Sequence, residues 1–224
     1  MKMAKGERRK AKWRYLHFAL CTLPFAIFLS GCVSFQVGGE IQQGRMELLY
    51  GDPKVALAHF QRAAELDPDY RLQYSIFPEW VWTYVGRAYY AAGRLPEARQ
   101  ALERARAREE DSLARLYLGL VLAQDGDRAR GLREIEAGLK GVVDWYDYVE
   151  FYHMDGRYWD PGKYLRKAIQ KQLAALRGSD GSVQELTQSV ASLGREIEIE
   201  IDKSKQHKHL DLYRDGGAEP RKTP

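Results

Sequence analysis

Small and apolar residues recur at helical spacing through the middle of the chain. The clearest unit carries two stripes with the i, i+3, i+4, i+7 spacing of one helix face: Trp82, Val85, Gly86 and Tyr89, then Ala98, Ala101, Leu102 and Ala105. Three glycines lie inside such patterns and each is followed seven residues later by another: Gly44 and Gly51, Gly86 and Gly93, Gly119 and Gly126. This recurrence predicts pairs of short helices that bury their apolar faces by stacking on one another.

Capping residues and turn signals set the expected limits of these units. Asp52 and Asp127 are suited to cap a second helix, and Pro53 and Pro96 are suited to its first turn. We expect repeats at about 40–68, 79–110 and 112–140, with the surplus stretch from Asp69 to Pro78 as a loop or a helix extension. Gly and Ala inside the stripes let two helix axes approach closely.

The C-terminal third departs from this repeat. Residues 141–178 are expected to form a degenerate fourth repeat or capping helices, with one helix from Val142 to Met154 and another after Asp160-Pro161. A capping box at Ser182 and Glu185 starts a further helix over 180–213. Isoleucine and glutamate alternate over 196–201 as in a strand, but the longer 3–4 spacing before them favours a helix. The polar tail, 214–224, is expected to be disordered.

The landmark residues resemble those of the tetratricopeptide repeat (TPR) over roughly 40–140. The second unit is the closest match, whereas Glu47 in the first stands where an aromatic is usual, and Gly131 and Gly138 in the third replace alanines. The resemblance implies protein binding, and a solenoid of this kind needs an atypical terminal unit to cover its last apolar face. We therefore expect an all-α, TPR-like helical-repeat solenoid with extra C-terminal helices.

The N-terminal segment has the order of a secretory signal peptide. A basic stretch from Lys2 to Arg14 precedes an apolar run that ends at Leu29-Ser30-Gly31-Cys32. The tetrapeptide resembles a bacterial lipobox, which implies cleavage after Gly31 and acylation of Cys32, with palmitate as the expected chain. Residues 1–31 would then be a lipoprotein signal peptide and 32–39 a lipid-anchored tether. Because Val33 is not aspartate, resemblance to enteric lipoproteins implies the periplasmic face of the outer membrane.

Two alternatives apply to this segment. An uncleaved membrane helix from Trp13 to Gly31 is near the lower limit of about 17–25 residues that a bilayer requires. A twin-arginine export signal at Arg8-Arg9 is less favoured, because the three following residues do not continue its pattern. All three readings place the rest of the chain outside the cytoplasm, in the cell envelope of a bacterium.

The charge of the chain argues against one class of partner, and its cysteine content argues against one kind of covalent stabilisation. The chain carries a net charge of +4, but residues 1–31 hold seven Lys/Arg and one Glu, so the 28 basic and 30 acidic residues that remain give about −2. Nucleic-acid binding needs a persistent basic face, so it is not expected. Cys21 and Cys32 are the two cysteines, so the part after Cys32 cannot form an internal disulfide.

Catalytic signatures are absent from the sequence. There is no nucleophile elbow, phosphate loop or paired-cysteine metal site, so we expect no enzyme, no cofactor and no metal. His207-Lys208-His209 has no companion ligands nearby and is better explained as a solvated helix end.

Two surfaces are candidates for binding. Arg45 and Arg87 follow Gly44 and Gly86 at matching places, and the TPR resemblance implies that they share a concave groove with Thr83 and Tyr90. Guanidinium groups favour carboxylates, so a protein or peptide partner near the membrane is expected; two ordinary surface arginines are the alternative. The second surface is aromatic and acidic, with the candidates Trp145, Tyr148, Tyr152 and Trp159.

The aromatic run, which extends from Trp145 to Trp159, also has two interpretations. Exposed rings beside carboxylates suit a sugar polymer or a partner protein, whereas buried rings would cap the solenoid core. The predicted function is a membrane-anchored scaffold in envelope complex assembly. The alternative is a protein or enzyme accessory that binds cell-wall polymer, such as peptidoglycan or a polysaccharide.

Overall fold

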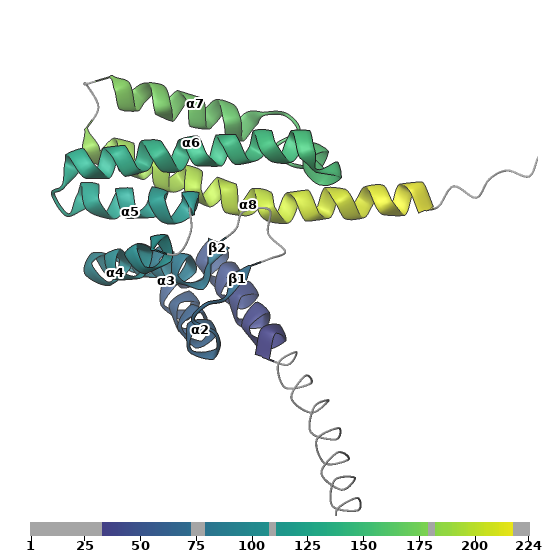
Figure 1. Ribbon diagram of the computed structural model, residues 1–224, viewed down its shortest axis with the longest axis horizontal. Coiled ribbons are helices and arrows are strands. Elements are labelled where there is room, and N and C mark those ends of the chain that lie inside the picture. Colours follow the sequence, from purple (N-terminus) through teal and green to yellow (C-terminus); the bar gives the residue numbers. More distant parts are fainter. Residues whose placement is uncertain (1–32, 73–78, 108–110, 179–181, 217–224) are drawn as a thin grey trace, which may run out of the picture.

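The computed structural model describes residues 33–72, 79–107, 111–178 and 182–216, and this part of the chain is all-α apart from one short strand pair (Figure 1). The first helix, 33–50, precedes α2 (Pro53–Leu66); α3 (Val81–Ala91) precedes α4 (Leu95–Arg106); and α5 (Ser112–Gln124) precedes α6 (Arg128–Tyr152). The 3₁₀ helix η1 (Met154–Tyr158), α7 (Tyr164–Arg177) and α8 (Val183–Gly216) follow. The predicted all-α helical-repeat fold is confirmed. Residues 1–31, which we expected to be a signal peptide, and Cys32 lie outside the described residues, as does the tail 217–224.

Local chemistry explains where the repeat helices begin and end. The Asp52 carboxylate accepts the backbone N–H of Lys54 at 2.8 Å, and Asp127 accepts that of Arg130 at 3.2 Å, which satisfies donors that a helix N-terminus leaves free. Gly93 and Gly126 follow the helices α3 and α5 with φ of +74° and +97°, a conformation that suits glycine.

The helices of each pair approach closely where glycine was expected at the contact. A Cβ atom at Gly86 would lie 2.7 Å from Cδ2 of Leu102, and one at Gly119 would lie 2.6 Å from the backbone nitrogen of Ile135. Leu102 of α4 is therefore the residue that lies closest to Gly86.

Three segments differ from the sequence prediction. α6 continues through Gly141, where we expected a boundary at 141 and a new helix from Val142. At this point Gly141 packs closely on the side chain of Ser112 at the start of α5, so the glycine serves a helix contact rather than a helix end. Residues 33–39 are the start of the first helix rather than a separate tether. In the surplus stretch, β1 (Arg71–Leu72) pairs antiparallel with β2 (Glu79–Trp80).

α8 joins the two halves of the molecule. One apolar core lies between the first helix, α2 and α3, and a second spans α4 to α8. In Figure 1, α5, α6 and α7 run roughly parallel, α8 runs beside them, and its C-terminal end extends past the bundle. Ile197 and Ile201 of α8 are buried, which explains why the alternating segment is helical: these residues, four apart, share the face that packs on the bundle. Within the described ranges, no helix is both long and apolar enough to cross a membrane.

Candidate functional site

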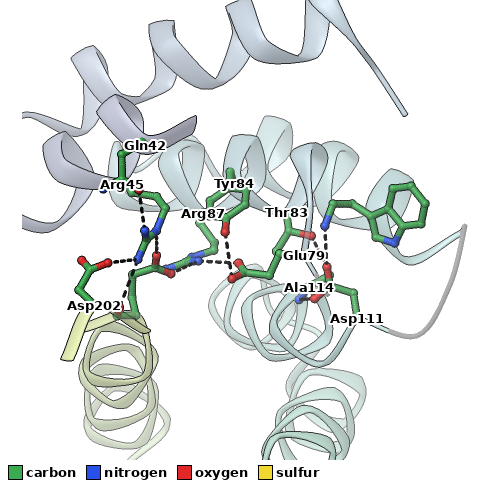
Figure 2. Close-up of polar contacts among 11 residues, drawn as sticks. Gln42, Arg45, Glu79, Thr83, Tyr84, Arg87, Asp111, Ala114 and Asp202 are labelled. Atoms are coloured by element: carbon green, nitrogen blue, oxygen red, sulfur yellow. Dashed lines mark hydrogen bonds and ion pairs between the residues drawn. The ribbon is translucent and has the colours of Figure 1, made fainter. Parts of the chain in front are cut away.

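Arg45 and Arg87 lie together, as their matching repeat positions predicted, and both are buried (Figure 2). Their shared partner is Glu198 of α8, which pairs with Nε of Arg45 and, at 2.6 Å, with Nη1 of Arg87. The carboxylate that the two arginines were expected to take from a partner is thus supplied by the same chain, 153 residues after Arg45.

Further acidic groups surround the two guanidinium groups. Arg45 also lies 3.1 Å from Oδ1 of Asp202, one helical turn beyond Glu198 on α8. Arg87 Nη1 lies 2.8 Å from Oε2 of Glu79, and the Tyr84 hydroxyl donates to the other oxygen of Glu79 at 3.1 Å. We call Arg45, Glu79, Arg87, Glu198 and Asp202 the ionic cluster.

Burial and charge act in opposite directions on the two glutamates of the ionic cluster. Burial raises the pKa of Glu79 to about 8, with a further contribution from the negative charge of Glu198, although Arg87 acts against both. Burial alone would also raise the pKa of Glu198, but the guanidinium groups of Arg87 and Arg45 hold it below its usual value. The two arginines therefore favour the ionised form of Glu198, whereas burial favours the protonated form of Glu79.

The other two residues predicted for the groove have different roles. Thr83 is buried, and its hydroxyl donates to Asp111 Oδ2 at 2.6 Å; Asp111 in turn caps α5 by accepting the N–H of Ala114 at 2.8 Å. Thr83 therefore ties the second repeat to the third. Tyr90 is half-buried, and its hydroxyl accepts a hydrogen bond from Gln124 Nε2 at 2.8 Å.

The repeat surface that carries the two arginines is consequently not an empty groove in this structure. α8 lies on it, and its carboxylates neutralise the arginines that the sequence placed there. Glu79, Glu198 and Asp202 were missed as site residues. One signal was available: Glu198 lies on the same helical face as Ile197 and Ile201, and a carboxylate on an apolar face needs a buried cation.

The aromatic run divides between core and surface. Trp159 is 5% exposed and packs near the ring of Tyr146, so its assignment to an aromatic surface was wrong; it belongs to the apolar core that spans α4 to α8. Trp145, Tyr148 and Tyr152 form a ladder along the last turns of α6, with ring centroids 5.3 and 5.0 Å apart. Tyr148 and Tyr152 are 45% and 67% exposed, so this ladder reaches solvent.

The acidic residues near the ladder are organised by Arg166 of α7. Its guanidinium group pairs with Glu150, lies 3.1 Å from Oδ1 of Asp147, and lies 3.3 Å from Oδ2 of Asp160. Asp160 also accepts the backbone N–H groups of Leu165 and Arg166, both at 3.0 Å, at the start of α7. These contacts hold the end of α6 against α7. Across the described residues, no group of three or more His, Cys, Asp or Glu is placed to hold a metal ion.

Comparison with known proteins supports the repeat part of this description. A family model described as "Tetratricopeptide repeat" matches residues 47–124, from the end of the first helix to the end of α5. No curated protein and no solved structure matches the chain. Tetratricopeptide repeats generally mediate protein–protein interactions and are typically non-catalytic, so the matched region is similar to a module that binds proteins.

Proposed function

We propose that this chain is a membrane-anchored TPR lipoprotein that acts as a protein-interaction scaffold in the assembly of a bacterial envelope complex. The observation that carries this proposal is the match of residues 47–124 to a tetratricopeptide-repeat family model, because such repeats generally mediate protein–protein interactions. The charge of the mature part, about −2, argues for a protein partner and against nucleic acid.

The anchor is assigned to Cys32, at the end of the signal segment. Because residues 33–39 are helical, they rise about 1.5 Å per residue and span about 10 Å, less than half of the roughly 25 Å of an extended tether. Phe35 is 85% exposed and Val33 is 37% exposed at this end of the first helix, which suits an interface with lipid. The repeats would then lie close to the membrane, and the expected partner is a membrane protein or lies beside the membrane.

Replacement of Cys32 by serine tests the anchor. Cys32→Ser should release the protein from membranes or stall its processing, because the acylated thiol is lost. Cys21→Ser is the matched control, since Cys21 lies inside the apolar run and should leave fractionation unchanged. If Cys32→Ser reaches mature size and remains with the membrane fraction, the chain is not lipid-anchored.

Crosslinking in intact envelopes, followed by purification from detergent, tests the scaffold role. The anchored protein should retain a membrane-associated partner, and Cys32→Ser should lose it. Capture of the same partners by both forms would contradict a role at the membrane. Reversing Arg45 and Arg87 to glutamate is an unsuitable test of partner binding, because both side chains are buried against Glu198 and the variant would repel α8.

A second function is favoured by the exposed ladder. Exposed aromatic rings that follow one another along a helix, flanked by carboxylates, suit a cell-wall polymer, such as peptidoglycan or a polysaccharide, which can lie across them. Tyr148→Ala with Tyr152→Ala should then reduce co-sedimentation with purified peptidoglycan. Tyr164→Ala is the control, because Tyr164 is 77% exposed but lies on α7, outside the ladder. Equal co-sedimentation of all three proteins would exclude the ladder as a polymer site.

A further inference from the structure

A cavity of about 190 Å³ lies where α8 meets the first two repeats, next to the ionic cluster. Its apolar wall includes Leu48 and Leu49 of the first helix and Ala191 of α8. Arg87 and Tyr90 of α3 and Arg195 of α8 add polar groups. Two of the residues that the sequence predicted for the groove, Arg87 and Tyr90, therefore line the part of it that α8 leaves open.

Two guanidinium groups at this cavity have unused hydrogen-bonding capacity. Arg87 is 2% exposed, and among the described residues no group accepts a hydrogen bond from its buried Nε. Arg195 is exposed and donates from Nη2 to the backbone oxygen of Leu49, but within the described ranges no carboxylate pairs with it. Since a guanidinium group carries five N–H donors, Arg195 retains several for a ligand.

The charge balance points to an anion. Glu198 and Asp202 balance the charges of Arg45 and Arg87, so among the described residues the positive charge at the cavity without a carboxylate partner belongs to Arg195. The apolar wall adds a second requirement, because a fully hydrophilic anion such as phosphate would leave Leu48, Leu49 and Ala191 uncovered. The volume is below the roughly 300–1,000 Å³ of sites for drug-sized ligands, so the occupant is a smaller group than a drug-sized ligand.

We infer that this cavity binds a small carboxylate with a compact aliphatic group. The carboxylate lies against Arg195, and the aliphatic part lies on the leucines of the first helix. Such a group is either a free short-chain acid or the C-terminal residue of a partner peptide. The inference deepens the proposed binding role of the repeat surface and rests on it, but it does not depend on the anchor.

Calorimetric titration of the purified full-length protein tests the chemistry with defined probes. The free-acid probe is 4-methylpentanoate and the peptide probe is acetyl-Ala-Ala-Leu with a free C-terminus. The corresponding amides should bind at least about tenfold more weakly, the change expected when one charge-assisted hydrogen bond is lost. Tighter binding of the peptide acid identifies a partner's C-terminus, whereas binding of the free acid alone identifies a small-molecule ligand.

Matched variants place the binding in this cavity. Arg195→Gln should weaken binding of the acid about tenfold or more, whereas Arg133→Gln on α6, also exposed and without an ion pair to any described residue, should not. Ala191→Leu should fill the cavity and abolish binding, and Ala174→Leu on the exposed face of α7 should not. Melting curves identify any variant that fails to fold. If Ala191→Leu fails to fold, the titration of Arg195→Gln tests the site instead, because the Arg195 side chain is exposed.

Three results would overturn the inference: no binding of either acid, equal binding of acids and amides, or equal binding by Arg195→Gln. Binding of inorganic phosphate as tight as that of 4-methylpentanoate would also overturn it, because the apolar wall would then have no role. None of these results bears on partner capture in envelopes, which is measured with different material, so the failure of this inference is separable from the failure of the proposed function.

Discussion

Glu198 is the residue whose charge most directly holds α8 on the repeats. Glu198→Gln keeps the shape of the side chain and removes its charge, so Arg45 and Arg87 lose the partner that they share. Both guanidinium groups remain buried, and each retains a single acidic neighbour: Asp202 at 3.1 Å for Arg45, and Glu79 at 2.8 Å for Arg87.

These remaining neighbours set the size of the effect. Removing one partner of a buried ion pair costs about 3–5 kcal/mol, because a buried charge is left without compensation. Asp202 keeps its pairing with Arg45, and the pKa of Glu79 should fall once the negative charge of Glu198 is gone, so that Glu79 ionises beside Arg87. We therefore expect Glu198→Gln to lower the free energy of unfolding at pH 7 by about 2–4 kcal/mol.

Urea unfolding followed by circular dichroism measures this loss as a lower midpoint at an unchanged m-value. Glu196→Gln is the matched control, because Glu196 is exposed two residues away on the same helix and its replacement should stay within about 0.5 kcal/mol of the wild type. If Glu198→Gln is as stable as this control, the charge of Glu198 does not hold α8 and the reasoning is refuted.

Two further predictions concern pH and packing. The pKa of Glu79 is raised to about 8, so the folded state keeps a proton that the unfolded state loses above the ordinary pKa of 4.5, and stability should fall as pH rises between these values. Glu79→Gln should therefore make the decline in stability from pH 6 to pH 9, measured by urea unfolding, shallower. An identical decline in the variant would contradict this. Gly86→Leu should overpack the contact with Leu102, cost about 1–3 kcal/mol and lower the melting temperature. Gly39→Leu is the control and should not lower it, because no atom lies within 4 Å of a Cβ added there. Equal melting temperatures of the two variants would contradict the α3–α4 contact.

The repeat helices could be predicted because their signals are local. Helical periodicity, the Asp52 and Asp127 caps, and the glycines after α3 and α5 act within a few residues of where they stand. Gly141 shows the limit of such signals. Glycine disfavours a helix by about 1 kcal/mol relative to alanine, and this suggested a boundary, but its contact with Ser112 lies inside a continuous α6.

The candidate site was predictable only in part. Matching repeat positions brought Arg45 and Arg87 together, yet Glu198 lies 153 residues after Arg45, and no local pattern shows that α8 reaches both arginines. The same holds for the aromatic run, where helical spacing cannot tell that Trp159 is buried while Tyr152 is exposed.

The sequence by itself determined the helix pairs, their close glycine contacts and the presence of two arginines at equivalent repeat positions. Only the tertiary structure decided that these arginines are buried, that their counter-ions come from α8, and that a small cavity remains beside Arg195. The physical reason is range: caps and periodicity act along one helix, whereas burial and the pairing of charges depend on which distant segments exclude water from the same place.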